Sequence, residues 1–410
     1  MNLSVEHLPE SCDVLVVGAG PAGSATAIEL ARSGLDVVLV DQHVFPRDKV
    51  CGDALIPDAH AALKRLGMLR AVMARAQAVS HVGCVAPRGG RVDVPGTLAV
   101  LPRRVLDDLL CRAAVLAGAR MVAPARFIEV IEEKDGRVVG ARLRGTGTIQ
   151  DVRARWVVLA TGAVPQALMA AGVCDRQLPS GVALRAYVRN AEMVPKLKAL
   201  DIVWHRALRP GYGWIFPCGD GLFNIGVGVS QSHGARDGSG GGSKKDDANL
   251  RDIFKAFTEF YAPARELMEG GQMVGELKGA PLRCTLEGAR HSRPGLLVTG
   301  EAAGSTYAFT GEGIGKAMET GILAAEAVRG GGDDNAVRKR YEASLLKLKP
   351  KFDLYERANQ VNAHPWLADL LVWRARKSPK LVQRMSGVLN ETSNPGNLIS
   401  VRGMLRLFTL

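Results

Sequence analysis

The stretch Asp13-Val-Leu-Val-Val-Gly18-Ala-Gly20-Pro21-Ala22-Gly23 decides how the N-terminal part of this chain folds. Its apolar residues 14–17 predict a buried parallel strand, and its glycines predict a tight turn into a helix over residues 21–32. A second apolar strand over residues 36–40 follows and ends at Asp41. Strand, turn, helix, second strand and acidic residue therefore come in the order of a βαβ unit that binds a dinucleotide.

Each residue type in this unit suits one part of such a ligand. Gly18 and Gly20 let the backbone approach a pyrophosphate, and Gly23 lets the helix pack against the strand with its N-terminus facing the phosphates. The carboxylate of Asp41 can accept both hydroxyls of a ribose. A glycine-rich structural loop is the alternative, and the complete ordered set favours the dinucleotide site. We expect the flanking residues Pro21, Ala22 and Gln42 to bind the ligand as well.

Composition and charge restrict the classes to which the chain can belong. Its 410 residues are 47% hydrophobic, which suits a globular protein with two closely joined domains. The net charge of +12 favours anionic partners, but the basic residues are dispersed and aromatic residues are few, so nucleic acid is not expected. Seven cysteines without a CxxC pair indicate a reducing compartment and no metal site. Because no signal peptide or continuous apolar run of ~18 residues is visible, we expect a cytoplasmic protein.

The elements after residue 41 do not continue a simple dehydrogenase fold. An intervening sheet separates the first βαβ unit from a later strand and helix that return to the nucleotide. This interleaving suits a flavoprotein in which distant segments close around an extended FAD, because a Rossmann dehydrogenase keeps its two halves contiguous. Periodicity and turn residues predict helices over 54–76, 102–118, 250–269 and 312–329, strands over 80–100, 180–230 and 272–284, a β-meander over 121–160, a mobile Gly- and Ser-rich loop over 231–248 and a helical, basic tail over 335–410.

Two segments in the first half carry residues suited to FAD. Arg103 begins an Arg-x-x-Leu-Asp-x-x-Leu helix start, where its guanidinium can lie over the pyrophosphate or the ribityl chain. An exposed arginine at a helix start is the alternative. The apolar strand that ends in Ala160-Thr161-Gly162 resembles the strand that covers the adenine side in FAD enzymes.

A third segment near residue 300 is the most specific of the set. Gly300-Glu301 ends a strand, where the carboxylate can hold a ribityl hydroxyl. Gly311, Gly313 and Ile314 begin a helix whose N-terminal amides can face the N1–C2=O edge of the flavin. Negative charge develops at this edge when the flavin is reduced, so the helix dipole would stabilise the reduced form.

Two longer motifs carry a resemblance to a known family. They read Pro46-Arg47-Asp-Lys49-Val-Cys51-Gly52-Asp53 and Tyr212-Gly-Trp214-Ile-Phe216-Pro217, the latter followed by Gly226-Val-Gly228. Together with the glycine motifs they resemble the geranylgeranyl reductase family, within the p-hydroxybenzoate hydroxylase-like FAD superfamily. The similarity extends over residues 12–330. It implies that Arg47, Lys49, Cys51 and Gly52 lie beside the flavin and that the second motif lines the substrate cavity.

The resemblance implies the chemistry of this family, which is hydride transfer from flavin N5 to an isolated carbon–carbon double bond of a prenyl-like or other long apolar chain. Tyr212, Trp214 and Phe216 alternate on a strand, so they project to one face and can line an apolar slot with Pro217 behind them. A sheet core is the alternative for these aromatic residues. Cys51, Tyr212 and Trp214 are the candidates for catalysis, although a cysteine beside a cofactor is more often a small apolar filler.

Three positions depart from the family pattern. Glu301 stands where the family usually has Asp, Ala308 stands where a proline is usual, and Leu277-Lys278-Gly279-Ala280 replaces the archaeal Leu-x-Gly-Asp. These changes suggest a substrate other than the usual geranylgeranyl lipid. An FAD-dependent monooxygenase (aromatic hydroxylase) or a flavin-dependent halogenase of the same fold is the runner-up. A flavin-binding sensor without enzymatic activity is a third alternative.

The expected partners follow from the same motifs. A second glycine motif for a dedicated NAD(P)H domain is not visible, so electrons would come from transiently bound NAD(P)H or from a ferredoxin- or flavodoxin-type donor. The substrate would be small and apolar or bound to a carrier, as in lipid or natural-product biosynthesis. Trp366, Trp373 and several basic residues in the tail suit contact with an anionic membrane, peripheral at its inner face, while packing on the protein's own domain is the alternative.

The expected fold is α/β, with an FAD-binding Rossmann-like domain interleaved with an antiparallel-sheet substrate domain and followed by a helical C-terminal region. We expect the FAD-binding domain at 1–80, 102–175 and 291–330, the substrate domain at 81–101 and 176–290, and the helical region at 331–410.

Overall fold

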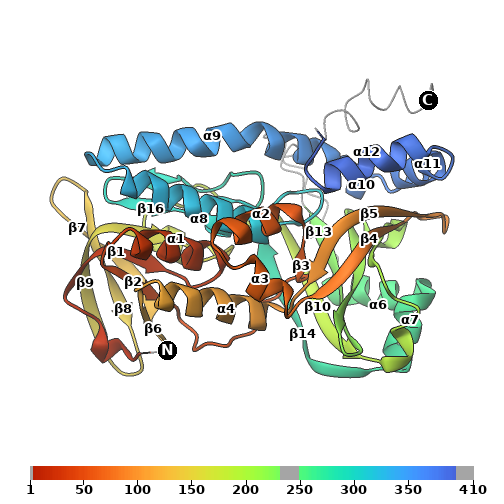
Figure 1. The fold of residues 1–410 in the computed structure, drawn as a ribbon, viewed down its shortest axis with the longest axis horizontal. Helices are drawn as coiled ribbons and strands as arrows, with labels where there is room; N and C mark the ends of the chain where they lie inside the picture. Colours follow the sequence, from red (N-terminus) through yellow and green to blue (C-terminus); the bar gives the residue numbers. More distant parts are fainter. Residues whose placement is uncertain (1–2, 231–248, 394–410) are drawn as a thin grey trace.

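The structure of the chain is a computed structural model that describes residues 3–230 and 249–393. Two sheets lie next to each other, and helices cover the first sheet and bridge toward the second (Figure 1). The predicted α/β class, with a helical C-terminal region, is confirmed. The Gly- and Ser-rich segment 231–248 and the residues 394–410 lie outside the described residues, so the expectations for them are not addressed.

The first sheet is built on the predicted βαβ unit. β1 (Ser11–Val17) pairs in parallel with β2 (Val37–Val40) on one side and with β9 (Ile149–Leu159) on the other. β16 (Leu296–Val298) pairs with the far side of β9, so segments near residues 15, 155 and 297 lie side by side. The sheet is completed by β6 (Arg120–Val122), β7 (Arg126–Glu132), β8 (Val138–Arg144) and β15 (Ser292–Arg293).

The glycine turn explains why the helix after β1 packs so closely on the sheet. α1 (Pro21–Arg32) begins directly after Gly20. A Cβ atom on Gly23 would lie 1.7 Å from the carbonyl oxygen of Gly18, so only glycine allows this approach. Gly18 itself has φ +102°, a conformation that other residues rarely adopt. The N-terminus of α1 therefore opens onto the turn, as the sequence predicts.

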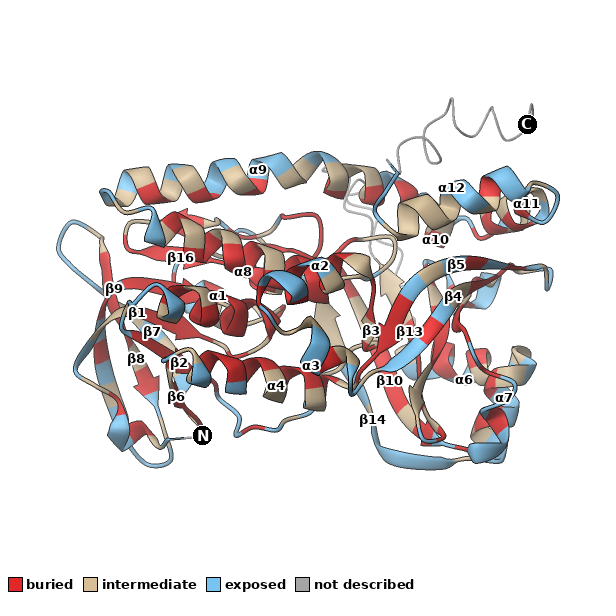
Figure 2. Ribbon diagram, in the orientation of Figure 1, coloured by how far each residue is buried: buried red, intermediate tan, exposed pale blue. Residues whose placement is uncertain are grey.

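Helices from distant parts of the chain cover this sheet and bury its apolar residues. α1 packs against α4 (Arg103–Leu116) and α8 (Ile314–Arg329), and the long α9 (Asp334–Ala358) lies along α8 (Figure 1). Figure 2 shows the inner faces of these helices buried and the outer face of α9 largely exposed. The described residues also contain the short helix α5 (Gln166–Ala170). They contain 3-10 turns at Val5–His7, Ala191–Met193, Arg206–Leu208 and Gly300–Ala303.

The second sheet is mostly antiparallel and takes strands from three parts of the chain. Its order is β14-β10-β13-β12-β11-β4-β5-β3, and β11 pairs with β4 in parallel. α6 (Leu250–Phe260) and α7 (Ala262–Glu269) pack on one face around Phe257. The strands are β3 (Ala54–Leu55), β4 (Gln77–Val85), β5 (Arg91–Val100), β10 (Gly181–Arg189), β11 (Leu200–Val203), β12 (Gly211–Gly219), β13 (Leu222–Ser230) and β14 (Gln272–Leu282).

The prediction of one continuous helix over residues 54–76 was wrong. The segment begins with the strand β3 and then forms two short helices, α2 (Pro57–Arg65) and α3 (Leu69–Met73). Gly67, at φ +69°, separates these helices because an α-helix cannot continue through a left-handed residue. The apolar positions recur at helical spacing in both halves, which is why periodicity alone joined them.

The C-terminal helices reach the second sheet. α11 (Trp366–Ala375) and α12 (Pro379–Leu389) lie over β4 and β5, and the short α10 (Gln360–Ala363) contacts β12 (Figure 1). Apolar residues of both layers form a shared cluster that includes Val92, Val94, Val372 and Leu381. None of the helices among the described residues combines the length and apolar character that crossing a membrane requires.

Candidate functional site

An elongated cavity of about 1220 Å³ runs from the glycine turn, between the two sheets, to the C-terminal helices. This exceeds the roughly 300–1,000 Å³ typical of a small-molecule site, so it has room for an extended cofactor and a second molecule. The predicted site residues that line it are Gly18, Gly20, Pro21, Ala22, Asp41, Gln42, Arg47, Lys49, Cys51, Gly52, Arg103, Ala160, Thr161, Gly162, Tyr212, Trp214, Phe216, Glu301, Gly311, Gly313 and Ile314.

Three predicted site residues, Gly23, Gly300 and Pro217, are not among the residues that line the cavity. The two glycines serve close packing. A Cβ atom on Gly300 would lie 2.6 Å from that of Ala22, and the even tighter contact of Gly23 is described above. Pro217 follows Phe216 on β12, so the alternation of a strand directs it to the other face.

Two arginines face the glycine turn at one end of the cavity. A Cβ atom built on Gly20 would lie 3.7 Å from Arg47 Nη2 and 3.8 Å from Arg103 Nη2. Arg103 donates to Asp107 through Nε at 2.7 Å and Nη2 at 2.8 Å, and Arg47 Nη1 donates to the same carboxylate at 3.0 Å. Asp107 therefore holds both guanidiniums beside the N-terminus of α1, which is the environment that a pyrophosphate needs.

Asp41 lies at the end of β2, as predicted, and its carboxylate also supports the turn. Its Oδ2 accepts from the Ala19 amide at 2.9 Å and its Oδ1 from the His43 amide at 2.9 Å. Burial acts to raise the pKa of Asp41, but hydrogen bonding from His43 and the charge of Arg47 outweigh it, and the pKa is lowered. The ionised carboxylate keeps further lone pairs, so it can also accept ribose hydroxyls.

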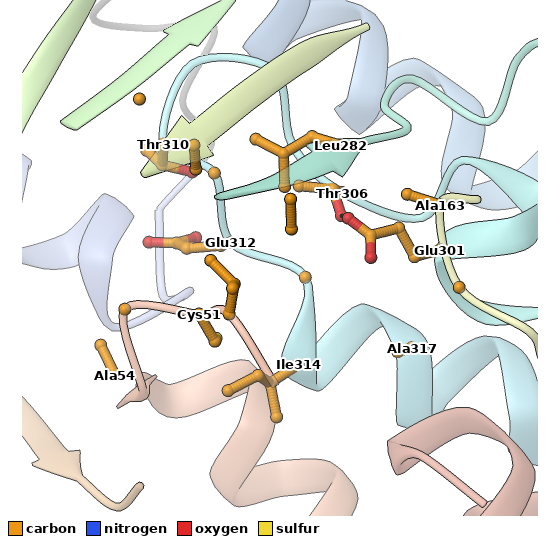
Figure 3. Close-up of a pocket in the computed structure, with 18 of the residues that line it drawn as sticks. Cys51, Ala54, Ala163, Leu282, Glu301, Thr306, Thr310, Glu312, Ile314 and Ala317 are labelled. Atoms are coloured by element: carbon orange, nitrogen blue, oxygen red, sulfur yellow. Dashed lines mark hydrogen bonds between the residues drawn. The ribbon is translucent and has the colours of Figure 1, made fainter. Parts of the chain in front are cut away.

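Polar groups in the middle of the cavity are arranged for a polar, extended ligand. The buried hydroxyls of Thr161 and Thr310 have no hydrogen-bond partner in the described part of the chain. Glu301 contacts Thr306 at 3.4 Å, and Figure 3 shows its carboxylate and that of Glu312 at separate positions around the cavity. Buried polar atoms are normally satisfied, so these hydroxyls indicate a ligand that supplies partners.

The start of α8 closes this part of the cavity. Gly313 is the N-cap of the helix, so its first amides lie at the cavity wall. The hydroxyl of Tyr212 donates to the carbonyl of Thr310 at 2.5 Å, which joins the aromatic strand to the loop before the helix. The paired arginines, the two helix N-termini and the orphaned hydroxyls together fit an FAD molecule bound along the cavity.

The three aromatic residues of β12 form one continuous wall. The ring centroids of Tyr212 and Trp214 lie 6.3 Å apart, and those of Trp214 and Phe216 lie 6.4 Å apart. Trp214 Nε1 donates to Asn224 Oδ1 at 2.9 Å, and Asn224 Nδ2 donates to the carbonyl of Cys51 at 2.8 Å. The wall is thereby fixed to the loop that the family resemblance places beside the flavin.

Asp53 anchors this loop, although the sequence analysis did not select it as a site residue. It is fully buried with φ +68°, and its Oδ2 accepts from Tyr187 at 2.5 Å and from Asn224 at 2.7 Å. Its Oδ1 accepts from the amide of Arg103 at 3.2 Å. Burial raises the pKa of Asp53 to about 6 against the lowering by these donors. Its position directly after Cys51-Gly52 was the only available signal, because its partners are far away in the sequence.

Cys51 lies at the cavity wall as an uncharged thiol. Its Sγ accepts from the amide of Asp53 at 3.3 Å, and burial raises its pKa. A buried thiol with a raised pKa does not act as a thiolate at neutral pH. The geometry therefore favours the interpretation of Cys51 as an apolar filler beside the ligand.

Comparisons with known proteins agree with this geometry. Residues 11–198 match the model of a family described as an FAD binding domain. The chain is 35% identical over 341 residues to the menaquinone reductase of Mycolicibacterium smegmatis (78% of this chain, 77% of the relative). It is 30% identical over 336 residues to digeranylgeranylglycerophospholipid reductase 2 of Methanopyrus kandleri (80% of this chain, 81% of the relative).

Solved structures show how widely the fold is shared. A geranylgeranyl bacteriochlorophyll reductase-like protein from Thermoplasma acidophilum superimposes with a TM-score of 0.70 at 24% identity, over 98% of this chain and 96% of that protein. The flavin-dependent brominase Bmp2 superimposes with a TM-score of 0.75 at 20% identity, over 97% of this chain and 98% of that protein. At such identities the likeness concerns the fold alone.

Proposed function

This chain belongs to the geranylgeranyl reductase family of FAD-dependent oxidoreductases, and on that premise we propose that it saturates carbon–carbon double bonds in the prenyl chain of an isoprenoid quinone or a related lipid. The family relationship makes it an FAD-dependent reductase of a prenyl-like substrate. The menaquinone reductase named above, at 35% identity, supports a quinone as the specific substrate.

The observation that carries this proposal is the apolar chamber at the far end of the cavity. Beyond the aromatic wall, the cavity continues between the second sheet and the helices α11 and α12. Its lining there is apolar on both sides and comprises Val82, Cys84, Val94, Trp204, Leu367, Ala368, Leu371, Val372, Leu381, Met385, Val388 and Leu389. A long prenyl chain would bury its surface here, at roughly 25 cal/mol per Å² of apolar area removed from water.

Some residues of the chain would bind FAD, and others would shield the reacting double bond from water. When bound, FAD supplies the hydride for the double bond. Gly20, Arg47 and Arg103 would hold its pyrophosphate, and the N-terminal amides of α8 would stabilise negative charge on its reduced ring. Trp214 and Phe216 would exclude water and hold the prenyl chain against the ring.

Anaerobic reoxidation separates this function from oxygen-dependent chemistry on the same fold. We expect the reduced enzyme to be reoxidised by a menaquinone with a short prenyl tail in the absence of oxygen, with one saturated bond formed for each two electrons. The measurement is stopped-flow absorbance of the flavin together with mass spectrometry of the lipid. A requirement for oxygen, or for oxygen and halide, would instead support the monooxygenase or halogenase alternative.

We also propose that α11 brings the enzyme to an anionic membrane surface. Trp366 and Trp373 are 61% and 51% exposed and lie seven residues apart, on one face of the helix. Leu371 and Val372 of the same helix line the apolar chamber, so α11 separates the chamber from the surface. Basic residues near these tryptophans comprise Arg374, Arg376, Lys377, Lys380 and Arg384. Exposed aromatic residues with adjacent cations suit the interface of an anionic bilayer, from which a lipid could enter.

Vesicle sedimentation tests whether α11 binds an anionic membrane. We expect the double variant Trp366→Ser/Trp373→Ser to bind phosphatidylglycerol vesicles about tenfold more weakly, or about 1.4 kcal/mol, with its flavin unchanged. The control is Leu116→Ser, which changes a residue 89% exposed on α4, away from α11 (Figure 1). Equal binding by both variants, or equal binding to neutral phosphatidylcholine vesicles, would contradict the proposal.

A further inference from the structure

Four charged residues, of which Asp58 and Lys316 are buried, lie beside the cavity at the start of α8. Glu312 lines the cavity directly before this helix, and Lys316 lies on its first turns. Asp58 of α2 approaches from the side, and Glu391 follows α12. The side chains of Asp58 and Lys316 are only 4% and 6% exposed. Ionisable groups that are partly buried next to a reaction cavity are candidates for proton transfer.

Contacts at Lys316 connect the buried Asp58 with carboxylates nearer the protein surface. Lys316 Nζ lies 3.8 Å from Asp58 Oδ2 and 2.8 Å from Glu319 Oε2, and the Glu319 side chain is 36% exposed. Lys316 also lies 3.8 Å from Glu391, which pairs with Lys351 at 2.5 Å. Lys316 therefore lies among three carboxylates, which keep its positive charge beside the start of α8.

Burial and the negative charge of Asp58 raise the pKa of Glu312. Neither of its carboxylate oxygens has a hydrogen-bond partner in the described part of the chain. A Cβ atom on Gly315 would lie 2.4 Å from Asp58 Cγ, so glycine at this position lets the carboxylate reach the helix start. Burial, then the charges of Asp58 and Glu391, raise the pKa of Glu312 to about 8, while Lys316 and Lys351 act in the opposite direction. A pKa raised in this direction favours the protonated acid at neutral pH.

We propose that Glu312 is the catalytic acid that delivers the proton during reduction of the double bond, and this inference rests on the proposed function. The π bond of the alkene breaks and a C–H bond forms at each carbon. One carbon receives the hydride of the reduced FAD, and the other receives the proton of Glu312, which becomes a carboxylate. Lys316 and the amides of α8 stabilise this anion, and a proton from solvent then restores the acid for the next turnover. An NAD(P)H- or ferredoxin-type donor would supply the two electrons for the next turnover.

Other protic groups at the cavity are less suited to this step. The Tyr212 hydroxyl already donates its hydrogen to the carbonyl of Thr310, and burial raises its pKa. Burial likewise raises the pKa of the Cys51 thiol, which makes it a weak acid. Glu312 combines a position at the cavity wall with charged neighbours that act on its carboxyl group.

The variant Glu312→Gln keeps the size of the side chain and removes the acidic proton. We expect its FAD content and its anaerobic reduction by dithionite to match the wild type. Reoxidation of its reduced form by a short-tailed menaquinone should be at least about 100-fold slower, the usual contribution of a general acid. Glu326→Gln, which changes a half-exposed residue of α8 that pairs with Arg65 and does not line the cavity, is the matched control. If the wild type reoxidises and Glu312→Gln matches it, the assignment of Glu312 is wrong; if the wild type fails, the proposed function is wrong.

The pH dependence gives a second test. Because Glu312 must be protonated, the rate of reoxidation by menaquinone should be constant below pH 8 and fall as the pH rises through about 8. Asp58→Asn removes a like charge, so the fall should begin at lower pH. In flavin-free protein, infrared spectroscopy should show a carboxylic acid C=O band at pH 7 that is absent in Glu312→Gln. An unshifted profile in Asp58→Asn, or an unchanged infrared spectrum in Glu312→Gln, would overturn the proposal.

Discussion

The variant Gly20→Val is expected to fold normally but to purify without flavin. A Cβ atom at this position meets only the ends of two arginine side chains, at 3.7 and 3.8 Å, so the apoprotein can accommodate it. The branched side chain would occupy the space between the glycine turn and these guanidiniums, where we place the pyrophosphate. We expect FAD affinity to fall at least about 100-fold, or about 2.8 kcal/mol at 1.4 kcal/mol per tenfold.

The measurement is the flavin absorbance of the purified variant, followed by titration of the apoprotein with FAD. Circular dichroism and thermal unfolding of flavin-free samples show whether the fold is retained. Ala31→Val, near the other end of α1, adds bulk to the same helix and should keep its flavin. A yellow Gly20→Val protein with wild-type affinity would mean that the cofactor does not bind at this turn.

Replacing Asp107 with alanine should produce the largest loss of stability among these variants. Its fully buried carboxylate accepts three hydrogen bonds from Arg103 and Arg47. Removing one partner of a buried ion pair leaves the other charge without compensation, which costs about 3–5 kcal/mol. We expect this decrease in the free energy of unfolding of the flavin-free protein, measured by urea denaturation, together with weaker binding of FAD.

Asp108→Ala is the matched control for this variant. Asp108 is the next residue of α4, but its partner Arg112 is 59% exposed, so the pair should contribute no more than about 1 kcal/mol. Equal destabilisation by the two substitutions would show that the buried carboxylate does not organise the two arginines. If Asp107→Ala loses FAD but keeps its stability, Asp107 contributes to FAD binding and not to the stability of the flavin-free protein.

Much of the site could be predicted because its signals are local. The strand at residues 14–17, the turn and α1 follow from periodicity and from glycine positions, and the structure places them as expected. The alternation of Tyr212, Trp214 and Phe216 likewise follows from the two-residue repeat of a strand. The position of Arg103 in the site was harder to predict, because an arginine at a helix start can equally be exposed. The structure buries it at 8% exposure against Asp107.

The sequence by itself determined the glycine turn and the aromatic wall, since each depends on neighbours within a few residues, and the order of its separated motifs indicated FAD. The tertiary structure alone gave Asp53, Asn224 and Glu312 their surroundings. Asp53 meets Tyr187 from 134 positions away and Asn224 from 171 positions away. The pKa of Glu312 depends on burial and on Asp58 and Glu391, which come from other elements. Desolvation and charge act through space, so a pattern along the chain does not contain them until the chain has folded.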